Sequence, residues 1–247
     1  MQVTKHDPGT FCYIELATPD RKGAAKFYEG LFGWKMKETP LPDGSMYVQP
    51  QKNGRDAGGI YETKETPPSW LSYIAVASAD DAAAKVESLG GQLIMKPFDV
   101  MDLGRMALVT DPQGAPFAVW QAKANPGVGV RDESGTLCWN ELATRDVDAA
   151  RKFYTSLFGW GPKVSPEYTE WHVGSKAIGG LMKAPAEEIP PHWLVYFMVD
   201  DVDASTKKGT SLGARTYVEP MDIPKVGRFS VVADPYGASF ALFKPSM

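Results

Sequence analysis

The stretch CWNELATRD, residues 138–146, nearly repeats the stretch CYIELATPD, residues 12–20. In each stretch the side chains change face at every step, as in a half-buried strand, and one glutamate lies in the middle. Alignment of residues 9–34 with residues 135–160, without gaps, gives 16 identities in 26 positions. The chain therefore contains an internal duplication.

The similarity continues to the end of both copies. The shared segments are GGI and GGL (58–60 and 179–181), PPSWLSYIAV and PPHWLVYFMV (67–76 and 190–199), and GRMALVTDPQGAPFAVW and GRFSVVADPYGASFALF (104–120 and 227–243). We therefore predict two tandem homologous domains, residues 1–122 and 135–247. Residues 123–134 between them are rich in glycine, proline and charge, which is typical of a linker.

Each copy begins with a predicted strand, Phe11–Thr18 in the first copy, that leads into an amphipathic helix. Asp20 and Asp146 are placed to cap these helices, because a carboxylate there accepts from the unpaired N–H groups of the first turn. A later strand and a second helix, at residues 80–89 or 203–212, follow in each copy. This order predicts an α+β fold in which each copy consists of two βαβββ units.

The bulk composition limits the classes of partner. The chain of 247 residues has a net charge of −4 and a pI near 5.5, whereas a nucleic-acid binder needs a basic face. No uncharged apolar run reaches the roughly 20 residues of a membrane span, and the beginning of the chain lacks the apolar segment of a signal peptide. We expect a cytoplasmic protein with a small-molecule ligand and neither a nucleic-acid nor a membrane partner.

The two cysteines, Cys12 and Cys138, occupy equivalent places in the repeat. Symmetry gives them no reason to meet, and two cysteines cannot build a disulfide framework. We expect both to be small, buried core residues.

The shared motifs ELATxDxxxAxKFYxxLFGW, PPxWLxYxxV and GRxxxxxDPxGAxFAL resemble those of the vicinal oxygen chelate superfamily of glyoxalases, bleomycin-resistance proteins and extradiol dioxygenases. The tandem branch, called glyoxalase-like or hydroxylase-like, is the most similar. The resemblance covers nearly the whole chain. It implies paired βαβββ units whose curved sheets form open cups, one per domain, that hold a divalent metal or a hydrophobic ligand.

The resemblance also tells where a metal site belongs. Metal-using members place a histidine on the first strand, a second histidine after the Gly-Gly segment, and a glutamate on the last strand. In this chain those positions hold Tyr13, Leu71 and Ala118 in the first copy, and Trp139, Leu194 and Ala241 in the second. A divalent ion needs several N, O or S donors, so we expect no metal ligands at these places and no cofactor. A non-standard divalent site elsewhere in a cup stays open as an alternative.

The repeated glutamates, Glu15 and Glu141, are the first candidates for chemistry. Strand alternation places them on the same face as Tyr13 and Trp139, which under the resemblance is the interior of the cups. Burial there raises the pKa of a carboxyl group and suits it to general acid or base catalysis. The alternative is structural: each glutamate accepts hydrogen bonds from aromatic or backbone donors, or pairs with Arg105 or Arg228.

Two histidines occur only in the second copy, His172 in EWHVG and His192 in PPHW. They favour the second cup as the catalytic one and predict an acid–base or metal cluster of His192, Glu141 and His172. A lone histidine is more often a surface or hydrogen-bonded core residue, and that reading stays open.

Aromatic side chains gather at the predicted cups and suit a planar or hydrophobic ligand. The alternative is that they fill the cups as core. The ligand-binding candidates are Tyr13, Tyr73, Trp139, Tyr196, Trp70, Trp193 and His172, and the catalytic candidates are Glu141, Glu15 and His192.

Three functions follow from these residues and the resemblance. In the first, the protein binds a small aromatic or carbonyl-bearing metabolite and converts it without the usual metal, as a lyase, isomerase or hydroxylase-like enzyme; Glu141 is the acid or base, and Trp139 and Tyr196 position the ligand. In the second, it sequesters a drug or metabolite without turnover, as bleomycin-resistance proteins do. The third is a metal-dependent lyase or dioxygenase. Because two tandem domains satisfy the family's pairing within one chain, we expect a monomer, with weak dimerisation as the alternative.

Overall fold

The first copy folds into one continuous mixed sheet with two helices in the structure, a computed structural model that describes residues 1–246. Its elements are β1(Phe11–Thr18), α1(Arg21–Phe32), β2(Lys35–Pro40), β3(Met46–Lys52), β4(Arg55–Asp56), β5(Gly59–Glu62), β6(Ser69–Ala75), α2(Ala79–Ser88), β7(Gln92–Val100), β8(Gly104–Thr110) and β9(Pro116–Ala122). The strand order is β2-β3-β5-β1-β6-β9-β8-β7, with β4 paired to β3.

The second copy repeats this arrangement. Its elements are β10(Leu137–Thr144), α3(Val147–Phe158), β11(Gly161–Val164), β12(Thr169–Val173), β13(Lys176–Lys183), β14(His192–Met198), α4(Val202–Ser211), β15(Arg215–Ile223), β16(Gly227–Ala233) and β17(Ser239–Pro245). The strand order, β11-β12-β13-β10-β14-β17-β16-β15, matches that of the first sheet. Each sheet joins two βαβββ units side by side through its central antiparallel pair, β1 with β6 or β10 with β14. The predicted α+β fold of tandem, paired units is confirmed.

The helix that follows the first strand of each copy begins and ends as its sequence predicts. The carboxylates of Asp20 and Asp146 accept from the backbone N–H groups of Gly23 and Ala149 at 2.9 Å. Gly33 ends α1 in the left-handed conformation, with φ of 68°, where a side chain would be strained. None of the helices in the described chain has the length and apolar character that a membrane crossing requires.

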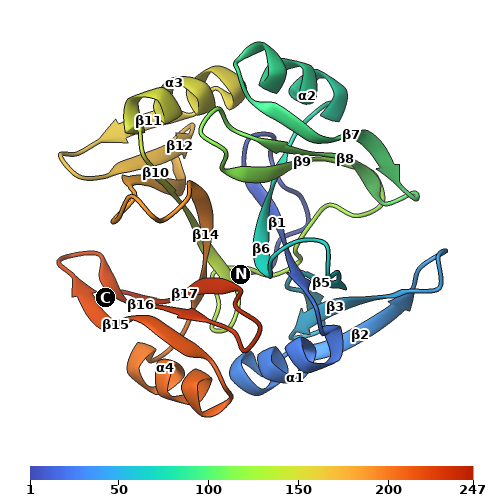
Figure 1. The fold of residues 1–247 in the computed structure, drawn as a ribbon, viewed down its shortest axis with the longest axis vertical. Coiled ribbons are helices and arrows are strands. Elements are labelled where there is room, and N and C mark those ends of the chain that lie inside the picture. Colours follow the sequence, from blue (N-terminus) through green and yellow to red (C-terminus); the bar gives the residue numbers. More distant parts are fainter. Residues whose placement is uncertain (247) are drawn as a thin grey trace.

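The two curved sheets lie back to back, so their concave faces open toward opposite sides of the molecule (Figure 1). Helix α1 packs beside α4, and α2 packs beside α3. Each of the two large hydrophobic cores therefore draws on both copies: one contains Leu16 and Trp34 with Phe197 and Phe240. The copies are halves of one interlocked structure.

Reciprocal hydrogen bonds join the copies and account for the repeated FGW segment. The indole N–H of Trp34 donates to the carbonyl of Gly135 in the second copy at 2.7 Å. The indole N–H of Trp160 donates to the equivalent Gly9 carbonyl in the first copy, also at 2.7 Å. Each tryptophan thus follows the glycine that ends its own helix and holds the start of the other copy's first strand.

A second pair of reciprocal contacts uses the aspartates of the DPxG turns. Trp70 donates from its indole to the hydroxyl of Tyr28 at 2.9 Å, and that hydroxyl donates to the buried carboxylate of Asp234 at 3.1 Å. The equivalent hydrogen bonds in the other half run from the Trp193 indole to the Tyr154 hydroxyl at 3.0 Å and from that hydroxyl to the Asp111 carboxylate at 3.3 Å. The repeated KFY and DPxG segments are therefore complementary parts of the interface between copies.

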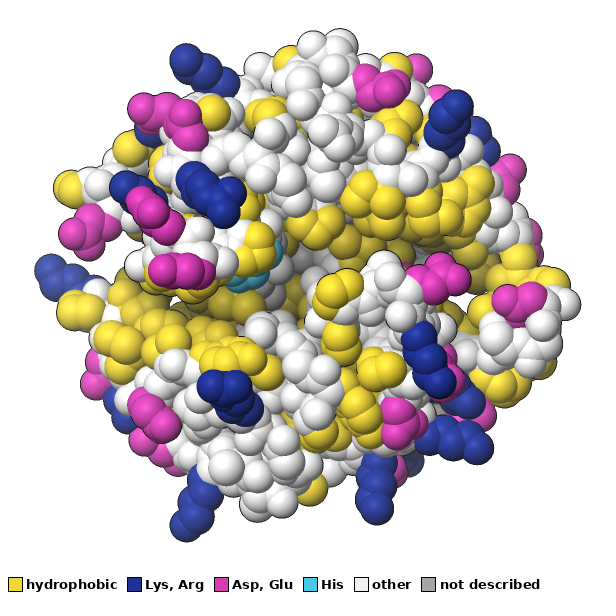
Figure 2. All heavy atoms as spheres, in the orientation of Figure 1, with side chains coloured by type: hydrophobic (Ala, Val, Ile, Leu, Met, Phe, Trp, Pro, Cys, Tyr) yellow, Lys and Arg dark blue, Asp and Glu magenta, His cyan; other side chains and the backbone are white. Residues whose placement is uncertain are grey.

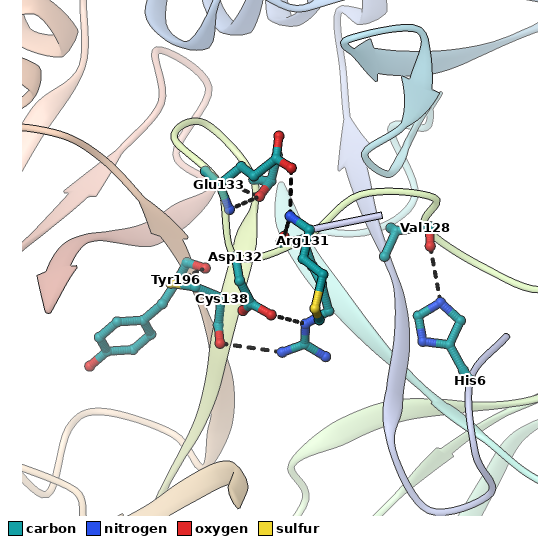
Figure 3. A network of polar contacts seen from close by, with 9 residues as sticks. His6, Val128, Arg131, Asp132, Glu133, Cys138 and Tyr196 are labelled. Carbon is teal, nitrogen blue, oxygen red and sulfur yellow. Dashed lines mark hydrogen bonds and ion pairs between the residues drawn. The ribbon is translucent and has the colours of Figure 1, made fainter. Parts of the chain in front are cut away.

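Hydrogen bonds and an ion pair hold the segment between the copies in place (Figure 3). The buried Arg131 guanidinium donates to the Asp132 carboxylate at 3.0 Å and to the Cys138 carbonyl at 3.4 Å. His6 in the N-terminal arm contacts the carbonyl of Val128 at 3.0 Å. Cys12 and Cys138 are buried and free, as predicted.

Candidate functional site

The concave faces of the two sheets, here called cup 1 and cup 2, carry matching clusters of apolar and aromatic side chains. Their openings show as hydrophobic hollows at opposite edges of the molecule (Figure 2). Cup 1 is lined by Cys12, Tyr13, Leu71, Tyr73, Ala75, Val100, Leu103, Met106, Ala118, Trp120 and Val128. Cup 2 is lined by Cys138, Trp139, Leu194, Tyr196, Met198, Phe229, Val231, Ala241 and Phe243.

In cup 1, a carboxylate is held between tyrosine hydroxyls. Register places Glu15 opposite Leu71 and beside the Tyr13–Tyr73 pair, on the concave face. Its two oxygens accept hydrogen bonds from Tyr47 and Tyr73, both at 2.6 Å. The hydroxyl of Tyr13 lies 3.2 Å from that of Tyr47. Both carboxylate oxygens of Glu15 are therefore engaged.

In cup 2, the equivalent carboxylate is less enclosed. Glu141 accepts a hydrogen bond from Tyr196 at 2.7 Å. Tyr168 is its second hydrogen-bonding neighbour, and the Tyr168 hydroxyl also accepts from the indole N–H of Trp139 at 2.9 Å. The ring of Tyr196 projects away from the Arg131 network, on the far side of β10 (Figure 3). The carboxylate of Glu141 therefore shares the Tyr168 hydroxyl with Trp139, whereas both tyrosine bonds of Glu15 are short.

Tyr47 and Tyr168 were not among the site residues predicted from the sequence. They come from the third strand of each copy, Tyr47 in β3 and Tyr168 directly before β12. The second glycine of each Gly-Gly pair makes room for them. A Cβ on Gly59 would lie 1.8 Å from the Tyr47 hydroxyl, and one on Gly180 would lie 1.7 Å from the Tyr168 hydroxyl. The Gly-Gly repeat was therefore the available sign that a side chain crosses the sheet surface next to each glutamate.

Burial raises the pKa of both carboxyl groups, and the hydrogen bonds from tyrosine hydroxyls oppose that rise. Desolvation is the larger effect for Glu15 and for Glu141, so each holds its proton at higher pH than an exposed glutamate. The neighbouring hydroxyls of Tyr73 and Tyr196 also have raised pKa values, because they are buried beside a carboxylate. Such a pair can donate to a ligand carbonyl or accept a proton from it.

These raised pKa values predict how stability varies with pH. A carboxyl group whose pKa is higher in the folded state contributes stability that is present below its unfolded pKa and lost as pH rises through its folded pKa. Replacement of Glu15 and Glu141 by glutamine removes that loss. We expect the melting temperature of the double variant, relative to wild type, to rise between pH 5 and pH 9 in thermal unfolding monitored by circular dichroism.

The control for this prediction is Glu29→Gln, on the exposed face of α1. Its melting temperature should follow that of wild type at every pH. A difference between the double variant and wild type that stays constant with pH would contradict the pKa assignment.

Neither arginine considered as a partner for the glutamates reaches them. Arg105 forms a two-pronged ion pair with Asp80, and Arg228 forms one with Asp203. Both pairs lie on the outer surface, where each arginine on a strand meets the first turn of the helix that precedes it in the same unit. The repeat preserves this contact, and the structural hypothesis of a Glu–Arg pair is wrong.

The hypothesis that Trp70 and Trp193 bind ligand is also wrong. Register pairs Trp70 with Leu16 and Trp193 with Leu142, so both indoles lie on the convex side of their sheets. They belong to the cores between the copies and bond to Tyr28 and Tyr154. Both tryptophans stand at the entry of a strand, and alternation from Glu15 and Glu141 places that position on the face opposite the cup.

The predicted cluster of His192, His172 and Glu141 is not assembled. The Nδ1 atom of His192 lies 2.9 Å from the Pro190 carbonyl at the start of β14. His172 instead contacts the carboxylate of Glu170 at 3.1 Å. Within residues 1–246, no three His, Cys, Asp or Glu side chains are grouped so that they could hold a metal ion.

The positions where the resemblance places metal ligands do come together in space. Tyr73 pairs in register with both Tyr13 and Ala118, and Leu71 lies in the same cluster. Cup 2 repeats this gathering with Trp139, Leu194 and Ala241. These side chains are aliphatic or aromatic, and the Tyr13 hydroxyl already contacts that of Tyr47. This donor set does not fit a divalent metal.

The second unit of each sheet supplies an apolar wall opposite the carboxylate. In cup 1, Phe98 pairs with Met106, which pairs with Trp120 across three neighbouring strands. In cup 2, the same row is Met221, Phe229 and Phe243. Each cup therefore has a polar end on its first unit and a hydrophobic wall on its second.

Known proteins are similar to this chain over nearly its whole length. The family model described as Glyoxalase/Bleomycin resistance protein/Dioxygenase superfamily matches residues 10–119 and again residues 136–242. A Mycobacterium tuberculosis protein named "Putative glyoxylase CFP32" is 39% identical over 254 residues, covering 98% of this chain and 97% of that protein. The anthracycline biosynthesis protein DnrV of Streptomyces peucetius is 34% identical over 267 residues, covering 97% and 94%.

Solved structures share the fold at low sequence identity. The Mn(II)-bound glyoxalase from Novosphingobium aromaticivorans has a TM-score of 0.68 at 15% identity, covering 96% of this chain and 82% of that one. The 2,3-dioxygenase LapB from Pseudomonas sp. KL28 has a TM-score of 0.68 at 13% identity, covering 97% and 94%. These similarities concern the fold alone.

Proposed function

The chain belongs to the Glyoxalase/Bleomycin resistance protein/Dioxygenase superfamily. From this premise we propose that its cups bind a flat aromatic metabolite with a ketone or phenol oxygen. We further propose that the protein transfers a proton from one atom of this metabolite to another. The observation that carries this proposal is the buried carboxylate bonded to tyrosine hydroxyls at one end of an apolar cup. In cup 2 the family's metal-ligand positions hold Trp139, Leu194 and Ala241, which offer no metal donor, so the chemistry is assigned to Glu141 and its neighbouring tyrosines.

The shape and chemistry of the cups support a ligand of this kind. A hydrophobic wall such as Phe229 with Phe243 stabilises a planar ring by burial and by aromatic contact. The Glu141–Tyr196 pair supplies both a donor and an acceptor for one ligand oxygen. Two similar proteins are named anthracycline biosynthesis proteins, and anthracyclines are polycyclic aromatic ketones with phenol groups.

Proton transfer is the reaction that these groups can perform unaided. In its ionised form, Glu141 removes a proton from carbon next to the ligand ketone. The single O–H of Tyr196 turns from the carboxylate to donate a hydrogen bond to the ligand oxygen that becomes negative. The proton then returns from the Glu141 carboxyl group to a different atom of the same ligand. Atoms and electrons balance, and the product is an isomer of the substrate.

Binding without conversion is the second candidate. Cup 1 favours it, because both oxygens of Glu15 are held by Tyr47 and Tyr73 and are less free to exchange a proton. A sequestering protein of this type would bind its ligand stoichiometrically and release it unchanged.

Titration with quinizarin (1,4-dihydroxyanthraquinone), followed by calorimetry, tests the proposal. We expect saturable binding to wild type. Replacing Phe229 and Phe243 together by alanine should weaken it by about tenfold or more, because the hydrophobic wall is lost. The control is Val164→Ala, an exposed position outside both cups, which should leave the affinity unchanged.

The same samples separate the two candidates. Mass spectrometry after long incubation of the protein with aromatic ketones that carry an acidic C–H shows an isomer if the protein is an enzyme. Absence of saturable quinizarin binding to wild type would overturn the proposal. Binding that survives loss of both walls, Phe229 with Phe243 in cup 2 and Met106 with Trp120 in cup 1, would overturn it as well.

A further inference from the structure

The two cups differ in the solvent exposure of the side chains that line them. Tyr13, Met106 and Trp120 are at most 9% exposed in cup 1. Their counterparts in cup 2, Trp139, Phe229 and Phe243, are all partly exposed. Val128 fills cup 1 further. Its side chain is 1% exposed, and its backbone N–H donates to the Cys12 carbonyl at 2.8 Å. Cup 2 therefore presents more accessible ring surface.

The two carboxylates differ in the same direction. Glu15 has one tyrosine hydroxyl at 2.6 Å on each oxygen. Glu141 has one such short bond, from Tyr196 at 2.7 Å, and the Tyr168 hydroxyl beside it is shared with the Trp139 indole. A ligand at Glu141 therefore competes with a shared hydroxyl, whereas a ligand at Glu15 must displace one of two short tyrosine bonds.

Cup 2 also carries a polar pair that cup 1 lacks. Register places Glu170 beside Gly180, and Gly180 beside Glu141, so the two carboxylates lie in one row on the same face of the sheet. His172 contacts Glu170 at 3.1 Å, and the exposed Lys163 lies 3.5 Å from the same oxygen. In cup 1 the residue in this row is Gln49, because Gln49 and Glu15 flank Gly59.

From these differences we infer that cup 2 is the working ligand site and that Glu170, with His172, selects a ligand with a hydroxyl or amine remote from the oxygen held at Glu141. Two strand spacings separate Glu170 from Glu141, which is about 10 Å. That is the span of a tricyclic aromatic compound with a short polar substituent. The inference rests on the proposed function and specifies its site and substrate class.

Two probes and one matched pair of variants test the inference. The probes are quinizarin and 1-[(2-aminoethyl)amino]anthraquinone, which carries a primary amine. The variants are Leu194→Trp and Leu71→Trp, which add a large ring at equivalent positions in cup 2 and cup 1. We expect Leu194→Trp to abolish binding of both probes and Leu71→Trp to change affinity by less than about twofold.

The selecting pair is tested by Glu170→Gln, which installs the side chain found in cup 1. Because Glu170 is 39% exposed, the variant should fold. We expect its affinity for the amine probe to fall about tenfold, and its affinity for quinizarin to change less than about threefold. His172→Gln should shift the same preference in the same direction.

The outcomes separate the inference from the function on which it rests. If wild type binds neither probe, the proposed function fails. If Leu71→Trp abolishes binding while Leu194→Trp does not, ligand lies in cup 1 and the inference is overturned while the function stands. Equal losses for both probes in Glu170→Gln would overturn the assignment of selectivity. Circular dichroism of each variant establishes that it is folded.

Discussion

Replacement of Trp160 by alanine should lower the free energy of unfolding by about 3–5 kcal/mol, the cost of deleting a large buried aromatic side chain. Trp160 is completely buried and stacks on Tyr154, with ring centroids 5.4 Å apart. Its ring also packs against that of Phe11 in the first copy, with centroids 5.6 Å apart, and its indole N–H donates to the Gly9 carbonyl. Urea unfolding measured by circular dichroism gives the free energy directly.

The matched variant is Trp160→Phe, which keeps an aromatic ring and loses the N–H. It leaves the buried Gly9 carbonyl without this donor, at a cost of about 1–3 kcal/mol. A loss below about 1 kcal/mol for Trp160→Ala would contradict the shared core, since a tryptophan anchoring only its own helix end contributes less. Two separate unfolding transitions in wild type would contradict it as well.

The second large effect concerns Glu141. For any substrate that the protein converts, Glu141→Gln should lower kcat by about 10²- to 10⁴-fold, the usual contribution of a general acid or base. Glutamine keeps the size and the acceptor oxygen for Tyr196 but cannot take a proton, so ligand affinity should stay within about tenfold. Steady-state kinetics with a parallel calorimetric titration measures both quantities.

Glu15→Gln is the control for this effect, because it makes the same chemical change in cup 1. Its kcat should stay within about threefold of wild type. Turnover that survives in Glu141→Gln would show that this carboxylate is not the acid or base. An equal loss in both variants would show that the cups act together.

The architecture was predictable because the two copies can be aligned with each other. The duplication fixed equivalent strands and helices, and alternation from Tyr13 and Trp139 placed the glutamates on the concave faces. The same rule, applied from Glu15, puts Trp70 on the convex face. The prediction that Trp70 binds ligand relied on its place at the start of a strand, which does not determine the face. The positions expected to hold metal ligands were located correctly as a group, since strand registry brings them together.

The pairing of the copies could not be read from periodicity. An amphipathic helix such as α1 shows that one face is buried, but the pattern does not say which copy buries it. The bonds from Trp34 to Gly135 and from Tyr28 to Asp234 connect residues over 100 positions apart. Tyr47 and Tyr168 were missed for a similar reason: they reach the glutamates across a glycine on a neighbouring strand.

The most direct test of the central claim is a crystal structure of the protein with quinizarin bound. The account predicts a probe oxygen at about 3 Å from the Glu141 carboxylate, a hydrogen-bonding distance, with the rings against Phe229 and Phe243. Binding outside the cups, for example in the polar groove between α4 and β15 that Thr206 and Lys207 line, would contradict it.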